Sequence, residues 1–141
     1  MNDKTLLSEH VPLGTELPSL SMKFSTDMFK SGDVKTLHND YDAAKLEGLS
    51  RPVAVAPQVA ALVFRMMTLC FGGGWIVGGK GSLTFRRPMW SDDFASAHGV
   101  VTGKMVEGDR VRIVCDVWVE RSDGERAVVG TCSALNVTAR A

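Results

Sequence analysis

The hydrophobic pattern of the chain is dominated by one long apolar segment. Residues 57–71 contain no glycine and no internal proline, and they begin at Pro57 and end before Gly72-Gly73-Gly74. Proline is favoured at a first helical position and glycine ends helices, so this segment is predicted to be a helix. Its polar side chains fall on one narrow stripe, formed by Gln58, Arg65 and Thr68 with Ala61. We therefore expect the helix to be buried on most of its sides.

Most of the remaining chain has a period of two, which is typical of half-buried strands. Residues 19–24 alternate in this way, with Leu20, Met22 and Phe24 on one face. A loop over 33–40 and a short helix over 42–47, closed by Gly48, come next. Further strands are predicted over 75–87, 94–106, 110–121 and 125–138, and Asp123-Gly124 is a strong hairpin signal between the last two. In the strand at 110–121 one face carries Val111, Ile113, Cys115, Val117 and Val119.

One long buried helix and an antiparallel sheet that wraps it predict an α+β fold. The length of 141 residues fits a single domain. We expect residues 1–17, which include Pro12 and Gly14, to form an N-terminal arm, and residues 18–141 to form the domain.

The composition excludes several classes of partner. Basic and acidic residues are balanced at 16 each, so neither nucleic acid nor an anionic membrane is expected as a partner. The apolar segment 57–71 is shorter than the roughly 20 residues of a membrane span. The first residues have no continuous apolar core of a signal peptide. We expect a cytoplasmic protein.

Metal and phosphate sites are not indicated. Cys70, Cys115 and Cys132 lie far apart and form no C-x-x-C motif, and His10 and His98 have no partners at ligand spacing. The sequence from Gly74 to Lys80 fits G-x-x-x-x-G-K, but Gly81 replaces the Ser or Thr that would bind magnesium. We therefore predict no metal and no resident cofactor.

Asp33 and His38 are the candidate catalytic pair. A carboxylate and an imidazole in one loop can converge on a single water, as general acid–base catalysis requires. An Asp that caps a turn and a His bonded to backbone would give the same pattern. The pair lies upstream of the helix that begins at Pro57, whose unpaired amides suit a carbonyl oxygen that gains negative charge.

The sequence SGDVKTLHND at residues 31–40 resembles the S-G-D-x-N-P-x-H-x-D pattern of MaoC-like dehydratases and R-specific enoyl-CoA hydratases. Lys35 and Thr36 stand where that pattern has Asn and Pro. The sequence VAVAP at residues 53–57 is similar to the family's I-A-H-G-M or V-H-G-P, with Val55 and Ala56 in place of His and Gly. FRRP at residues 85–88, followed by Asp92-Asp93, resembles F-x-x-P-x-x-x-G-D, with Asp92 in place of Gly.

The resemblance implies a hot-dog fold, in which a curved antiparallel sheet wraps a long central helix and two subunits join their sheets edge to edge. It further implies a hydro-lyase that adds water to an enoyl thioester or eliminates it from a 3-hydroxyacyl thioester, without metal. Coenzyme A enters only as part of the acyl-CoA substrate. Asp33 and His38 would be catalytic, and the Ala56 amide, beside Val55, would polarise the thioester carbonyl. A homodimer or dimer-based oligomer is the implied assembly.

The sequence is also consistent with other functions and with other roles for the basic residues. A hot-dog thioesterase would direct the activated water at the thioester carbon, and a non-catalytic homologue would bind an acyl group or serve as a partner subunit. Lys35 could pair with a substrate carboxylate or point to solvent. Arg86 and Arg87 could contact the phosphates of coenzyme A, or they could be solvated residues at the end of a strand.

Overall fold

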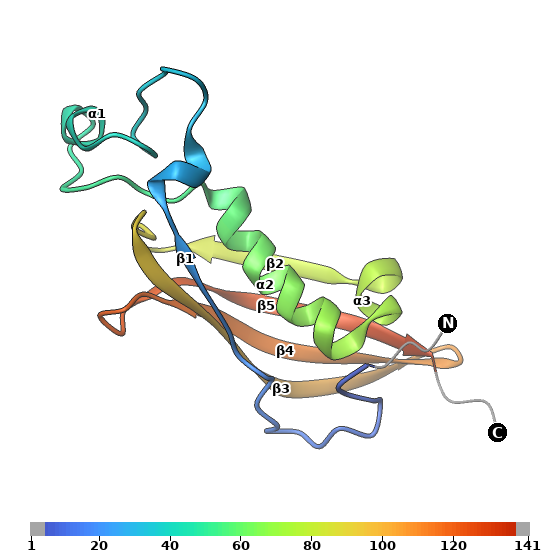
Figure 1. Cartoon of the computed structure of the whole chain (residues 1–141). Helices are drawn as coiled ribbons and strands as arrows, with labels where there is room; N and C mark the ends of the chain where they lie inside the picture. The colour runs from blue at the N-terminus through green and yellow to red at the C-terminus, as the bar shows by residue number, and fades with distance from the viewer. Residues whose placement is uncertain (1–4, 138–141) are drawn as a thin grey trace.

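A curved five-stranded antiparallel sheet holds one long helix against its concave face (Figure 1). The computed structural model describes residues 5–137, and the sheet order is β1-β3-β4-β5-β2. The strands are β1 (Leu20–Phe24), β2 (Lys80–Phe85), β3 (Asp93–Glu107), β4 (Arg110–Glu120) and β5 (Arg126–Val137). The helices are a 3-10 turn, η1 (Thr26–Phe29), and α1 (Tyr41–Leu46), α2 (Ala56–Phe71) and α3 (Gly73–Gly78). The predicted α+β hot-dog architecture is confirmed.

Helix α2 provides the largest single contribution to the core. Its inward-facing side chains are fully or almost fully buried against the sheet: Val59, Leu62, Val63, Met66, Met67, Cys70 and Phe71. The opposite face is less covered than its apolar composition predicts, since Phe64 is 37% exposed and Leu69 is 44% exposed. The expectation of burial on most sides is therefore wrong for this face.

The strand predicted over 75–87 is only partly correct, because residues 73–78 form the short helix α3 and the strand begins at Lys80. Two glycines allow α3 to lie directly on β5. A Cβ at Gly78 would come within 2.6 Å of the Leu135 Cβ, and one at Gly74 within 2.9 Å of the Leu135 carbonyl oxygen. Between them, Trp75 turns its ring toward Phe64 of α2, with the ring centroids 5.4 Å apart. Glycine here serves close packing between a helix and a strand.

Strand β4 follows the predicted alternation with one exception. Ile113, Cys115, Val117 and Val119 are buried in the core. Arg112, on the opposite face, is also buried, at 5% exposure. Its guanidinium donates to the Glu107 carboxylate at 2.6 Å, to the Gly78 carbonyl at 2.9 Å and to the Ser133 hydroxyl at 3.0 Å. The buried charge is thus paired, and it ties the end of α3 to the sheet.

The described part of the predicted arm, residues 5–17, packs on the domain. The Leu7 amide donates to the Cys70 carbonyl at 2.9 Å, and the Leu17 amide donates to the Gly99 carbonyl at 2.8 Å. Val11 and Leu17 are buried in the same core as α2. Residues 1–4 and 138–141 lie outside the described part of the chain. No helix within residues 5–137 is both long enough and apolar enough to span a membrane.

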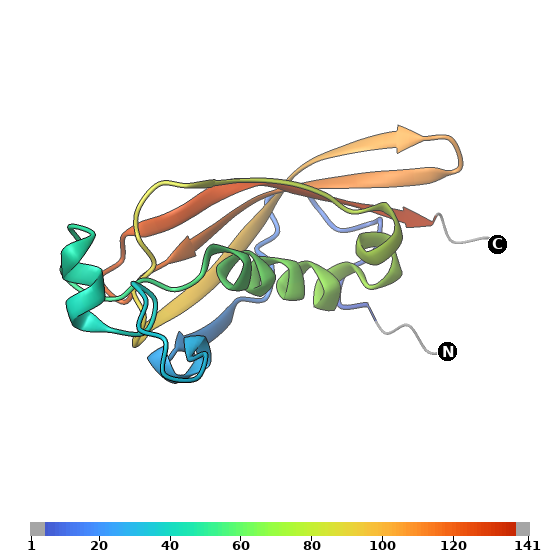
Figure 2. The same cartoon turned by 90° about the horizontal axis from the view of Figure 1, so that it is seen from above.

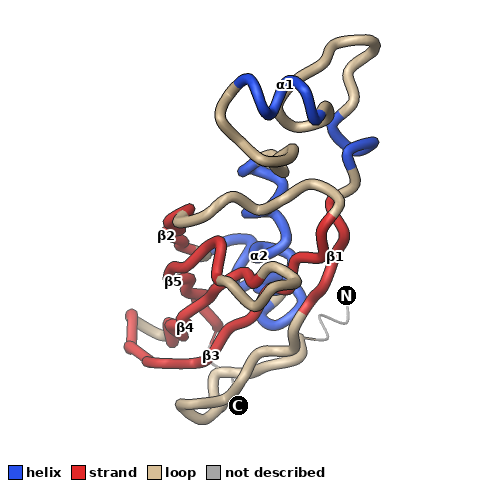
Figure 3. Tube along the Cα trace, turned by 90° about the vertical axis from the view of Figure 1, so that its left-hand side faces the viewer, coloured by secondary structure: helices blue, strands red, loops and turns tan. Residues whose placement is uncertain are grey.

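Residues 25–55 form a largely irregular segment that projects beyond the sheet at the N-terminal end of α2 (Figure 3). Figure 2, seen from above, shows this segment at one end of α2 and α3 at the opposite end. The segment holds the predicted loop at 33–40 and the short helix α1, close to the predicted 42–47. It begins after the buried Phe24, and the chain joins the core again at the buried Ala54. Both catalytic candidates therefore lie at the end of the molecule where α2 begins.

Asp92 anchors this segment to the sheet in an unusual backbone conformation. Its φ of 60° is the only positive φ of a non-glycine residue within residues 5–137, and the resembling family pattern has glycine there. The Asp92 carboxylate accepts a hydrogen bond from the Thr26 amide at 2.9 Å. That bond offsets the cost of the left-handed conformation, which is about 1 kcal/mol for a residue with a Cβ.

This arrangement predicts different effects for two substitutions of Asp92. Asp92→Ala loses the bond to Thr26 and keeps the strain, so the free energy of unfolding should fall by about 1–2 kcal/mol. Asp92→Gly loses the same bond but removes the strain, so its loss should be smaller by about 1 kcal/mol. Denaturant unfolding of both variants measures the difference. Equal destabilisation would show that the backbone at this position is not strained.

Candidate functional site

His38 is half-buried and held in one orientation by backbone. Its Nδ1 lies 2.8 Å from the Val53 carbonyl oxygen. A carbonyl only accepts, so Nδ1 carries the proton, and in the neutral ring Nε2 keeps a free lone pair. The ring packs against Phe29 at 6.3 Å between centroids, and the His38 carbonyl accepts a hydrogen bond from the buried Ser91 hydroxyl at 3.0 Å. The nitrogen that can exchange a proton with substrate or water is therefore Nε2.

Asp33 lies in the same loop but is exposed. It lines a cavity of about 340 Å³, the loop cavity, formed by Lys30, Gly32, Asp33, Val34, Lys35, Asn39 and Asp40. Within residues 5–137, no hydrogen bond or ion pair joins Asp33 to His38. The carboxylate is thus available to a water or a ligand. Lys35, also exposed, lines the same cavity as Asp33.

The start of α2 is fixed by backbone bonds on both sides. The Ala54 amide donates to the Met89 carbonyl at 2.7 Å, and the Val53 amide donates to the Leu37 carbonyl at 3.0 Å. The Val55 carbonyl accepts from the amides of Gln58 and Val59, which closes the first helical turn. Among the described residues no acceptor is found for the Ala56 amide, one of the unpaired donors of a helix start.

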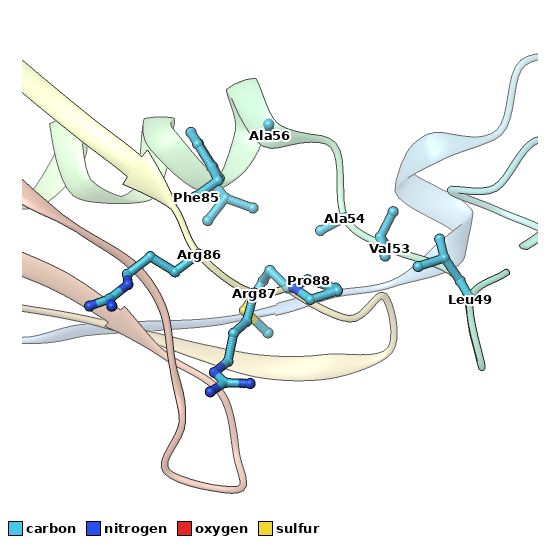
Figure 4. Close-up of a pocket in the computed structure, with 10 residues that line it drawn as sticks. Leu49, Val53, Ala54, Ala56, Phe85, Arg86, Arg87 and Pro88 are labelled. Atoms are coloured by element: carbon cyan, nitrogen blue, oxygen red, sulfur yellow. The ribbon is translucent and has the colours of Figure 1, made fainter. Parts of the chain in front are cut away.

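Ala56 opens onto a pocket of about 380 Å³, the helix-start pocket (Figure 4). Its lining is mostly apolar and comes from two segments: Leu49, Val53, Ala54, Ala56 and Val59 from one, and Phe85, Arg86, Arg87, Pro88 and Met89 from the other. The side chains of Arg86 and Arg87 extend away from the apolar group formed by Phe85, Ala54 and Val53. Arg87 instead pairs with Glu125 at 3.3 Å. The pocket therefore has a mostly apolar lining, with the two arginine side chains directed away from its apolar part.

The structure places five of the predicted site residues on two cavities that share no lining residue. Ala56, Arg86 and Arg87 line the helix-start pocket, while Asp33 and Lys35 line the loop cavity. Val55 lies in neither lining and instead closes the first turn of α2. His38 is in the lining of neither cavity, but the Val53 whose carbonyl accepts its Nδ1–H lines the helix-start pocket.

The sequence did not identify the apolar lining residues Leu49, Phe85 and Met89. Nothing in their local sequence distinguishes them from core residues, and Phe85 was visible only as the first letter of the F-R-R-P motif. They become a lining because the Ala54 amide and Met89 carbonyl join two chain segments that are distant in sequence. That long-range bond has no sequence signature.

No family model matches the sequence, and no curated protein sequence matches it. Solved structures do match. A MaoC-like dehydratase from Rhodospirillum rubrum superposes with a TM-score of 0.76 at 17% identity, covering 96% of this chain and 99% of that one. An (R)-hydratase from A. caviae involved in PHA biosynthesis gives 0.70 at 21% identity, with 93% and 100% covered.

A chain of the ChsH1–ChsH2 complex from Mycobacterium tuberculosis gives a TM-score of 0.69 at 21% identity, with 90% of this chain and 98% of that one covered. These likenesses extend over almost the whole length of the chain. The fold is therefore the hot-dog fold of the MaoC-like dehydratases and R-hydratases, as the sequence resemblance predicted.

All three cysteines are free and buried in the core, and Cys115 faces Cys132 across β4 and β5. Burial raises the pKa of the Cys70 thiol to about 11, that of Cys115 to about 12 and that of Cys132 to about 11. A thiol reacts as its thiolate, and a raised pKa lowers the thiolate fraction at any pH below it.

These thiols should therefore not react with an aromatic disulfide reagent in the native protein. We expect no colour from the native protein at pH 8 over several minutes, and the release of three equivalents per chain after denaturation. Absorbance of the released thiolate measures both. Rapid reaction of the native protein would contradict the buried placement of the cysteines.

Proposed function

We propose that this protein is a hydro-lyase of the MaoC-like type, which adds water to an enoyl thioester or removes it from a 3-hydroxyacyl thioester. One observation carries the proposal: His38 is hydrogen-bonded through Nδ1 to Val53, which leaves its Nε2 for proton exchange. Val53 lines a mostly apolar pocket together with Ala56, whose amide is an unpaired donor of the helix start. The shared fold of MaoC-like dehydratases and R-hydratases supports the reaction class. Metal chemistry is not part of the proposal, and coenzyme A enters as part of the substrate.

In the proposed hydration, Asp33 and His38 act on one water. The Asp33 carboxylate accepts a proton from the water as its oxygen bonds to Cβ of the enoyl group, while His38 Nε2 orients that water. The electron pair of the double bond moves onto the thioester, and the carbonyl oxygen gains negative charge beside the Ala56 amide. The proton is then delivered to Cα. A preorganised donor of this kind is worth roughly 3 kcal/mol.

The helix-start pocket would hold the acyl chain. Its lining is mostly apolar, and the side chains of Arg86 and Arg87 point away from Phe85, Ala54 and Val53, which favours an uncharged, apolar acyl group over a dicarboxylic one. Arg86 and Arg87, exposed beside it, would meet the phosphates of coenzyme A at the mouth. Lys35, on the loop cavity, remains a candidate for contact with the polar part of the substrate.

We further propose that two copies assemble through β2. Among the described strands, it lies at one edge of the sheet, pairs with β5 alone and is largely exposed. An exposed strand edge favours pairing with another chain. The similarity to a chain of a two-protein complex makes a related but different partner an alternative. Three free cysteines fit a reducing compartment such as the cytoplasm.

The dyad is tested with an unsaturated acyl-CoA such as crotonyl-CoA, by loss of the enoyl absorbance. Asp33→Asn and His38→Ala should each lower kcat by roughly 100-fold or more, since each removes a group that acts on the water. Asp42→Asn removes a carboxylate from the exposed start of α1, in the same segment, and should leave turnover unchanged. Full activity of both dyad variants would disprove the assignment.

Detection of free thiol alongside the loss of enoyl absorbance separates hydration from thioester hydrolysis. In a thioesterase the activated water attacks the thioester carbon, and free coenzyme A accumulates. A disulfide reagent detects that thiol, and the buried cysteines of the protein itself should not interfere. Release of free thiol at the rate of enoyl loss would favour the thioesterase, and binding of acyl-CoA without turnover would favour a non-catalytic acyl-binding protein.

Acyl selectivity should respond to Phe85, the largest side chain of the helix-start pocket. Phe85→Ala enlarges the chamber, so kcat/KM for six-carbon and longer enoyl-CoAs should rise severalfold relative to crotonyl-CoA, at up to about 0.8 kcal/mol per buried methylene. Phe94→Ala, an exposed Phe of β3 outside this pocket, is the matched control. An unchanged chain-length profile in Phe85→Ala would place the acyl group elsewhere.

A further inference from the structure

The loop that carries Asp33 and His38 has little regular structure, and one side-chain amide spans it. The Asn39 Oδ1 accepts a hydrogen bond from the Thr36 amide at 2.9 Å. Its Nδ2 donates to the Val34 carbonyl at 3.1 Å and to the Phe29 carbonyl at 3.1 Å. A single side chain thus uses both donors and its acceptor on three separate points of the loop backbone.

The two halves of the loop are anchored very differently. The His38 half is tied to the rest of the fold through the Leu37 carbonyl, the His38 imidazole and the His38 carbonyl. For residues 31–35, which include Asp33, the one hydrogen bond found to a described residue outside that stretch is the bond from Asn39 to Val34. The position of Asp33 relative to His38 therefore depends on the Asn39 amide.

The other contacts of Asn39 act on the same geometry. Phe29, whose carbonyl accepts from Asn39, packs its ring against His38. Thr36 stands where the resembling pattern has proline, which has no N–H and a fixed φ. The N–H that a threonine brings there is satisfied by Asn39. In this chain Asn39 restrains the loop at the point where a proline would otherwise do so.

We propose that Asn39 is the positioning residue of the site, which sets the distance from the Asp33 carboxylate to the His38 imidazole. The proposal rests on the proposed function of that pair. Asn39 need not touch the substrate, because it acts through backbone groups of Phe29, Val34 and Thr36. These groups precede and follow Asp33, and the Phe29 ring packs against His38. Only an amide suits this role, since a carboxylate would face the carbonyls of Phe29 and Val34 without donors.

The test compares Asn39→Ala and Asn39→Asp with the native protein in crotonyl-CoA turnover. We expect kcat to fall on the order of 10- to 100-fold, the effect of misplacing a catalytic group by about 1 Å, while KM stays within about threefold. Binding of butyryl-CoA, which is saturated and unreactive, should be unchanged by calorimetry. Amide hydrogen exchange at Thr36 should become faster in Asn39→Ala, because that N–H loses its acceptor.

Ser25→Ala is the matched control. It removes another side-chain-to-backbone bond of the same segment, which the Asp27 amide donates to the Ser25 hydroxyl, and no hydrogen bond among the described residues joins Ser25 to residues 31–40. We expect it to keep native kcat even if it lowers the melting temperature as much as Asn39→Ala does. Native kcat in both Asn39 variants, with Asp33→Asn and His38→Ala inactive, would overturn the positioning role and leave the dyad standing. Active Asp33→Asn and His38→Ala would overturn the proposed function itself.

Discussion

The burial of one face of α2 against the curved sheet is the constraint on which the site depends. That face is fully apolar, and it packs against side chains of β3, β4 and β5 in one continuous core. Burial fixes the axis of the helix and thereby the place where its unpaired amides emerge, at the end of the sheet. The irregular segment at residues 25–55 needs no core of its own, because it is attached to this end by the bonds of Asp92 to Thr26 and of Ala54 to Met89 and by the bridge between Val53 and Trp90.

The sequence was sufficient for the architecture because the architecture is periodic. The apolar run of α2 and the alternation in β1 and β4 arise from the geometry of the helix and the strand themselves, so they can be read from neighbouring residues. The stretch at residues 73–78 could not be read in this way. Its glycines indicated a strand or a turn, whereas they serve a helix lying on Leu135, a residue far along the chain.

The site was only partly predictable, for a related reason. Asp33 and His38 were identifiable because both lie within one short motif. The tautomer of His38 depends on the carbonyl of Val53, and the apolar chamber depends on Met89 meeting Ala54. The role of Asn39 likewise consists of three hydrogen bonds that the letters of the motif do not reveal. Distances between chain segments decide these features, and a sequence does not contain them.

The two walls of the helix-start pocket come from separate parts of the chain, one from residues 49–59 and one from residues 85–89. Residues 85–89 lie at the end of β2 and in the connection that follows it, and among the described residues they make no hydrogen bond to residues 31–40. Because this wall is joined to the start of α2 through the Met89 carbonyl, changes of its side chains leave that backbone bond in place. Under the proposed function, a fold built in this way would change its choice of acyl group through side chains of one connection while the proposed reaction stays the same.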